Sequence, residues 1–153
     1  MAVAKSLSFD TGAVEYDING AATVTFNPTD EGFVSKLYDT FGALDGLQDD
    51  MKQGDDAEDV LDKFARLDVE MRAAIDGLLG PGVSEALFAG MNCYAIADGL
   101  PVWMNLVLAL LDEVTEAYER EYGKTDDRLK AHSAKYDAII AKYGRKGKGP
   151  RLA

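Results

Sequence analysis

The sequence has very few of the side chains that catalysis and metal binding most often use. Its 153 residues include one cysteine, Cys93, and one histidine, His132. A single cysteine cannot form an internal disulfide, which fits a reducing compartment, and its apolar neighbours predict a buried thiol. A single histidine acts as a general base only where a nucleophile and an orienting group converge on it, and the residues beside His132 predict neither. We therefore expect no catalytic site, no cofactor and a non-enzymatic role.

The segment that comes nearest to a metal-binding loop is the acidic stretch from Asp49 to Asp56. A calcium-binding EF-hand loop needs oxygen ligands at its first, third and fifth positions and a glutamate at its twelfth. A loop that begins at Asp49 has glycine at the required sixth position, but Met51 at the third and Val60 at the twelfth. The stretch therefore predicts a solvated loop between two helices and no metal site.

Long apolar runs and an N-terminal signal segment are also missing. The longest apolar run, Leu100 to Leu111, covers 12 residues and contains Asn105. A membrane-spanning helix needs about 20 such residues, so the run predicts a buried core helix. A secretory signal requires an apolar core, and the residues before Asp10 contain none. We expect a cytoplasmic protein without a membrane partner.

Positive charge is scarce over most of the chain and is concentrated near its end. Residues 1–119 hold 6 Lys and Arg against 23 Asp and Glu, a net charge of −17, whereas residues 120–153 hold 10 against 4, a net charge of +6. The sequence pI is near 4.4, so the main body would repel the phosphates of a nucleic acid. Separated charge without catalytic groups is typical of a protein that works by binding another macromolecule.

The N-terminal residues predict a β-hairpin. Apolar and polar residues alternate over 14–18 and again over 22–26, and Asn19-Gly20 between them is a strong turn signal. A loop of three residues, ending at Ala21, places the apolar side chains of both strands on one face. The expected pairs are Ile18 with Ala22, Tyr16 with Val24, and Val14 with Phe26. Ser6–Asp10 can add a third short strand across a turn at Thr11-Gly12.

Four to five helices are expected after the hairpin. Asn27 is suited to cap the first, and apolar residues at spacings of three and four continue it to Met51. Further helices are predicted over residues 57–78, 84–89, 101–122 and 125–143, with Leu61 on the inner face of the second. The fold class is therefore α+β, mainly α, with an N-terminal hairpin of two or three short strands. We expect one domain over 1–143 (hairpin 1–27, helices 28–143) and a disordered basic tail over 144–153.

The strongest candidate for a partner-binding surface lies between Glu113 and the basic tail. This region combines charges of both signs with regularly spaced tyrosines, and tyrosine is enriched in protein interfaces. The alternative, in which the tyrosines only pack two helices together, stays open. Wide apolar stripes on the helices also allow self-association. The candidate partner-binding residues are Tyr118, Tyr122, Tyr136, Tyr143, Arg145, Lys146 and Lys148.

Three stretches of the sequence share a pattern with a known group of proteins. They are Leu7-Ser8-Phe9-Asp10-Thr11-Gly12 with Val14-Glu15-Tyr16 and Thr23-Val24-Thr25-Phe26-Asn27-Pro28-Thr29-Asp30, then Phe88-Ala89-Gly90-Met91-Asn92-Cys93-Tyr94, and Ala97-Asp98-Gly99-Leu100-Pro101-Val102-Trp103. Together they resemble small proteins encoded among the tail genes of long-tailed bacteriophages and prophages, the tail assembly chaperones. The resemblance covers residues 7–115 in order.

The resemblance implies a non-enzymatic role in virion morphogenesis in the bacterial cytoplasm. Such chaperones coat the long, helical tape measure protein, keep it soluble, help to recruit tail-tube subunits and are absent from the finished particle. The family has no residue motif with an assigned chemistry, so the resemblance implies no functional residues. Two alternatives remain: a structural tail or head–tail completion protein of the virion, and an acidic inhibitor protein that blocks a host factor.

Overall fold

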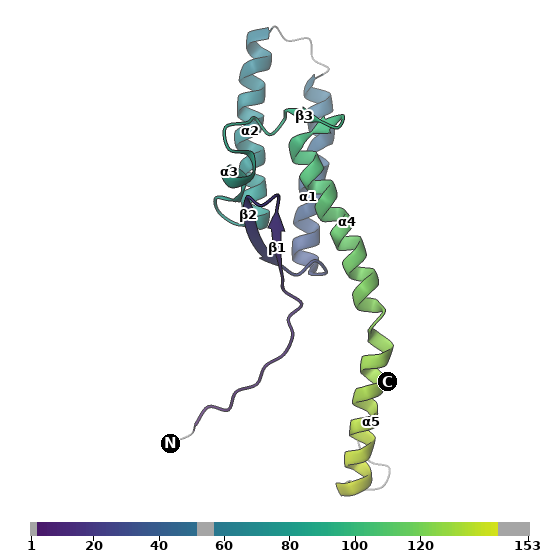
Figure 1. Cartoon of the computed structure of the whole chain (residues 1–153). Helices are drawn as coiled ribbons and strands as arrows, with labels where there is room; N and C mark the ends of the chain where they lie inside the picture. Colours follow the sequence, from purple (N-terminus) through teal and green to yellow (C-terminus); the bar gives the residue numbers. More distant parts are fainter. Residues whose placement is uncertain (1–2, 52–56, 144–153) are drawn as a thin grey trace. The chain divides into compact units, whose positions relative to one another are not determined.

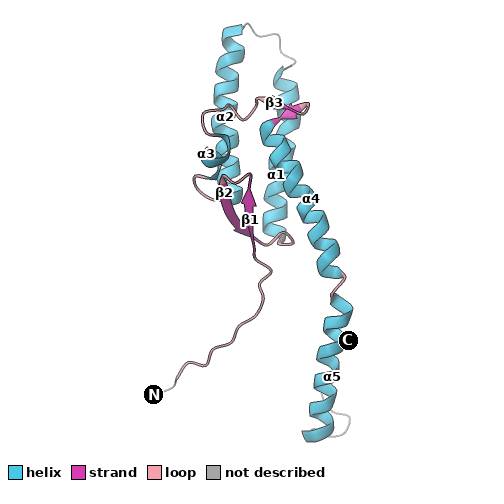
Figure 2. Ribbon diagram, viewed as in Figure 1, coloured by secondary structure: helices cyan, strands magenta, loops and turns pink. Residues whose placement is uncertain are grey.

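A computed structural model describes residues 3–51 and 57–143, and the side chains of residues 3–42 and 59–143. The residues for which one domain is expected fall into two compact units, Met1–Thr115 and Glu116–Ala153. The fold class is confirmed: a two-stranded N-terminal hairpin is followed by helices (Figure 1, Figure 2). In order, the elements are β1 (Val14–Ile18), β2 (Ala22–Phe26), α1 (Glu31–Met51), α2 (Ala57–Leu79), α3 (Val83–Phe88), β3 (Ile96–Ala97), β4 (Leu100–Pro101), α4 (Val102–Tyr122) and α5 (Thr125–Tyr143).

The hairpin has the predicted register. Asn19 and Gly20 both adopt positive φ, 56° and 66°, as a type I′ turn requires. The amide of Ala21 donates to the carbonyl of Ile18 at 3.0 Å, and Ala21 is the extra residue that shifts the pairing by one position. Ile18 therefore pairs with Ala22, and the two remaining apolar pairs also form as predicted.

The N-terminal segment does not add the third strand considered for Ser6–Asp10. The turn after it does form: the Asp10 carboxylate accepts a hydrogen bond from the Gly12 amide, and Asn27 Nδ2 donates to the Thr11 carbonyl, both at 2.8 Å. Gly12 has a φ of 77°, and a Cβ there would lie 2.5 Å from Asn27 Nδ2, so any other residue at this position would be strained. This turn leads residues 3–10 away from the hairpin as exposed, extended chain (Figure 2).

The first helix begins later than the sequence predicts. The Asn27 side chain accepts hydrogen bonds from the amide and hydroxyl of Thr29, both at 2.8 Å, and so stabilises a turn before the helix. The helix α1 begins at Glu31, and the carboxylate of Asp30 caps it by accepting a hydrogen bond from the Gly32 amide at 3.1 Å. The prediction that Asn27 caps the helix itself was therefore wrong.

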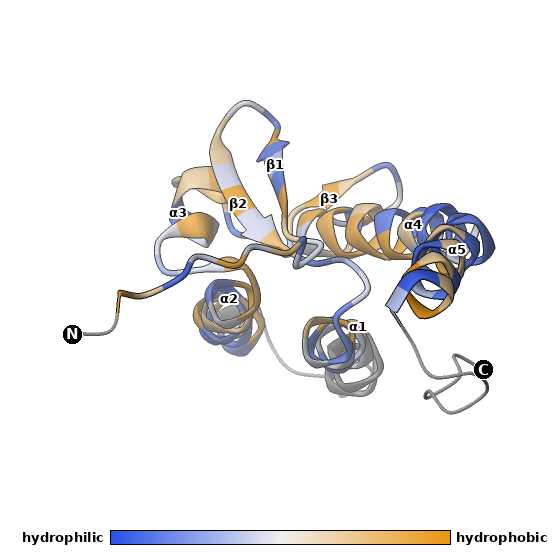
Figure 3. Ribbon diagram, turned by 90° about the horizontal axis from the view of Figure 1, so that it is seen from below, coloured by the Kyte–Doolittle hydropathy of each residue, from blue (hydrophilic) through white to orange (hydrophobic). Residues whose placement is uncertain are grey.

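The core of the first unit lies between the hairpin and the helices. The strand β2 packs on α2 and α3, and α1 packs on α2. Viewed along α1 and α2, the hairpin and α3 lie on the same side of this helix pair (Figure 3). Stacked rings connect the hairpin to α1, with 4.6 Å between the centroids of Tyr16 and Phe26 and 4.1 Å between those of Phe26 and Phe33. The largest fully buried side chains are Trp103, Leu37, Ile75, Met104, Val107 and Cys93.

Two expectations about burial have different outcomes. After Leu100 and Pro101, which form β4, the apolar run continues as the start of α4 and contributes buried core residues, as predicted. Leu61, expected on the inner face of α2, is 70% exposed, so that prediction was wrong. No helix in the described part of the chain is both long enough and apolar enough to cross a membrane.

Candidate functional site

The side chain of Arg72 on α2 holds the segment that follows α3. Its Nε donates to both carboxylate oxygens of Asp68 at 3.1 Å. Its Nη2 donates to the backbone carbonyls of Ala89 and Met91 at 2.8 and 2.6 Å. The guanidinium lies 5.7 Å from the centre of the Phe88 ring, within the range of a cation–π contact. One planar group with several donors thus binds two carbonyls of an irregular segment.

Two more polar side chains fix the path of this segment. The Asp68 carboxylate accepts a hydrogen bond from the Cys93 amide at 2.8 Å, and Asn92 Nδ2 donates to the Phe64 carbonyl of α2 at 3.1 Å. Burial alone would raise the pKa of Asp68. The hydrogen bonds from Cys93 and Arg72, together with the positive charge of Arg72, outweigh burial and lower that pKa. The segment is therefore held to α2 by the ionised carboxylate of Asp68, by Arg72 and by the neutral amide of Asn92.

Cys93 is expected to be unreactive while the protein is folded. Its side chain is fully buried, and burial, with the adjacent Asp68 carboxylate, raises the pKa of the thiol from 9.0 to about 12. Because the thiolate is the reactive form, Ellman's reagent at pH 8 should modify Cys93 only after denaturant unfolds the chain. The raised pKa also means that the free energy of unfolding falls as the pH rises from 9.0 towards about 12. Rapid modification of the native protein would contradict this burial.

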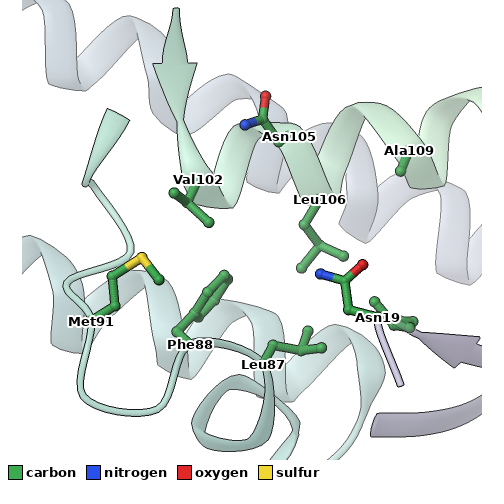
Figure 4. Close-up of a pocket in the computed structure, with 9 residues that line it drawn as sticks. Asn19, Leu87, Phe88, Met91, Val102, Asn105, Leu106 and Ala109 are labelled. Carbon is green, nitrogen blue, oxygen red and sulfur yellow. The ribbon is translucent and has the colours of Figure 1, made fainter. Parts of the chain in front are cut away.

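A groove of about 320 Å³ lies beside the same segment (Figure 4). Its walls come from the hairpin turn, from the end of α3 with the residues after it, and from the first half of α4. In Figure 4, Phe88 and Met91 face Val102, while Leu106 points towards Leu87 and Asn19. The lining residues are Ile18, Asn19, Leu87, Phe88, Met91, Val102, Asn105, Leu106 and Ala109.

The lining of the groove indicates what it can bind. Seven of its nine residues are apolar, two are asparagines and none is charged. Of the asparagines, Asn105 already donates from Nδ2 to the Ala97 carbonyl at 2.9 Å. Recognition of an amphipathic helix commonly uses such a groove, into which apolar side chains of the partner insert. The groove is therefore suited to an apolar protein surface.

The tyrosines predicted to bind a partner belong to the second unit. The rings of Tyr118 and Tyr122 stack with their centroids 5.8 Å apart. Tyr122 and Tyr143 are 70% and 74% exposed, and Tyr136 is half-buried. The structure thus brings two of the four tyrosines together and leaves two large rings accessible to a partner. The other three candidate residues lie outside the described residues: Arg145, Lys146 and Lys148.

The residues considered for catalysis and metal binding show no such arrangement where the structure describes them. His132 is exposed on α5. Among the described residues, no three His, Cys, Asp or Glu side chains lie close enough together to hold a metal ion. The centre of the acidic stretch between Asp49 and Asp56 lies outside the described residues, as does the predicted disordered tail.

Sequence reasoning missed both Arg72 and the groove. Arg72 had a local signal, because it is one of only six positive residues in 1–119 and follows Asp68 by four positions on a helix. The groove had none, because three segments far apart in the sequence form it. Comparisons with protein families, with curated proteins and with solved structures found no match for this chain.

Proposed function

We propose that this protein is a non-enzymatic phage tail assembly chaperone that binds the tape measure protein and helps to recruit tail-tube subunits in the bacterial cytoplasm. The observation that carries the proposal is an uncharged apolar groove on a strongly acidic unit. Residues 1–115 hold 6 Lys and Arg against 21 Asp and Glu, a net charge of −15. Apolar side chains of a client helix insert into the groove, and the negative charge keeps the complex soluble.

The position of the resembling stretches supports the same proposal. Phe88 and Met91 come from the second stretch and Val102 from the third, and all three line the groove. The first stretch covers parts of both hairpin strands, and the end of β1 and the turn between the strands, which lie outside that stretch, supply Ile18 and Asn19 to the lining. Two of the three resembling stretches therefore contribute residues directly to the surface that is suited to a client.

Co-expression with the tape measure protein encoded in the same tail-gene cluster tests this function. With this protein present, the tape measure protein is expected to become soluble and to co-purify, and the chaperone is expected to be absent from purified virions. An insoluble, unbound tape measure protein together with this chain in the virion would contradict the proposal. That result would favour a structural tail or head–tail completion protein.

A further inference from the structure

The end of α4 and the whole of α5 carry side chains at heptad spacing. Steps of four and three residues alternate along 118–143, and helices with this 3.5-residue period pair with one another. A two-residue turn, Gly123-Lys124, separates α4 from α5. In this turn the Lys124 amide donates to the Glu121 carbonyl, and the Arg128 amide of α5 donates to the Lys124 carbonyl, both at 3.1 Å. The large members of this heptad stripe are Tyr118, Tyr122, Leu129, Tyr136, Ile139 and Tyr143.

The heptad stripe is largely exposed. The helix α5 buries none of its residues, and Leu129 and Ile139 are 53% and 56% exposed. Helices in proteins gain most of their stability by packing an apolar face against another surface. A surface that covers the heptad stripe would therefore stabilise α5.

We propose that a second copy of this chain covers the heptad stripe, with the two helices antiparallel. The stripe positions are placed symmetrically about the midpoint of 118–143. When two copies lie antiparallel, there is therefore a single register in which every stripe position of one copy meets a stripe position of the other. Thr125 and His132 occupy the two remaining positions of the stripe. The opposed pairs are then Tyr118 with Tyr143, Tyr122 with Ile139, Thr125 with Tyr136, and Leu129 with His132.

The distribution of charge along residues 116–143 favours a second copy of this chain as the partner and an antiparallel orientation of the two helices. Residues 116–127 hold five Asp and Glu against two Lys and Arg, net −3, whereas residues 128–143 hold one against four, net +3. Antiparallel pairing places each acidic half beside a basic half, whereas parallel pairing places like charges together. Beside the stripe, Glu121 of one copy faces Lys142 of the other. Arg128 and Lys135 face each other nearer the centre and reduce this gain.

Light scattering during gel filtration of the full chain tests self-association, independently of any client. The wild type is expected to be a dimer whose dissociation constant Leu129→Lys raises by about tenfold or more. Ala131→Lys is the matched control, because Ala131 is exposed on α5 outside the stripe and the variant adds the same charge. Both variants should keep the fluorescence of Trp103, which lies in the first unit.

Charge reversal tests the orientation. Glu121→Lys and Lys142→Glu are each expected to weaken the dimer, and the double variant is expected to restore it, because the two residues face each other only in the antiparallel pair. A wild type that is monomeric at every concentration would overturn the proposal, as would a dimer that Leu129→Lys leaves intact. Single variants that the double variant does not rescue would overturn the orientation. A monomer in which Leu129→Lys abolishes tape measure binding instead would assign the stripe to that client.

Discussion

Replacement of Arg72 by alanine is expected to lower the free energy of unfolding by about 3 kcal/mol, within the range for breaking a buried ion pair. The Arg72 and Asp68 side chains are only 16% and 20% exposed, so the variant leaves a largely buried carboxylate without its cation. It also removes the donors of the Ala89 and Met91 carbonyls. Chemical denaturation followed by the fluorescence of Trp103, the only tryptophan, measures the change.

Arg66→Ala is the matched control for this experiment. Arg66 is exposed on the same helix, and its loss should change the free energy of unfolding by less than about 0.5 kcal/mol. Arg72→Lys should recover only part of the lost stability, because an ammonium group cannot reproduce the fork of donors that binds Asp68 and the two carbonyls together. Equal stabilities for Arg72→Ala and Arg66→Ala would contradict the role given to Arg72.

Replacement of Trp103 by alanine is expected to cost about 4 kcal/mol, within the range for truncation of a large aromatic residue in a core. The side chain is fully buried, and its ring meets that of Tyr94 edge-on at 5.8 Å between centroids. The Trp103 amide also donates to the Cys93 carbonyl at 3.0 Å. This hydrogen bond connects the first turn of α4 to the segment that follows α3. A melting curve by circular dichroism should show a loss of more than about 10 °C.

Trp103→Phe separates packing from hydrogen bonding at this position. The indole Nε1 is buried and has no acceptor among the described residues. Removing an unsatisfied buried donor regains about 1–3 kcal/mol, which offsets part of the lost ring volume. The phenylalanine variant should therefore be much more stable than the alanine variant. Equal destabilisation by both variants would contradict this description of the site.

Local patterns were enough to predict the hairpin and the last helix. The register of β1 and β2 follows from the requirement that the apolar residues of both strands lie on one face. The Asn19-Gly20 turn meets this requirement because Ala21 adds one residue to the loop. The bounds of α5, Thr125–Tyr143, agree with the prediction because Gly123 precedes the helix and apolar spacing continues to its end. Both signals lie within about 20 neighbouring residues.

Features that depend on contacts between distant residues were not predictable in this way. The helix α1 begins later than predicted because the Asn27 side chain donates to the carbonyl of Thr11, 16 positions earlier, and accepts a hydrogen bond from the Thr29 amide. The groove forms only where the hairpin turn, the first half of α4 and the residues that follow α3 meet. The path of the residues that follow α3 depends in turn on Arg72. The spacing of apolar residues within one segment does not indicate which distant segments it contacts, so the groove was found only in the structure.

The central claim is that the apolar groove receives the tape measure protein, and one side-by-side measurement tests it. Met91→Lys places a charge in the groove at a side chain that is 46% exposed, whereas Leu61→Lys makes a comparable change on α2 outside it. We expect Met91→Lys to reduce the co-purified tape measure protein by about tenfold or more, and Leu61→Lys to leave it at the wild-type amount. Wild-type recovery with Met91→Lys, in a protein of unchanged stability, would contradict the claim.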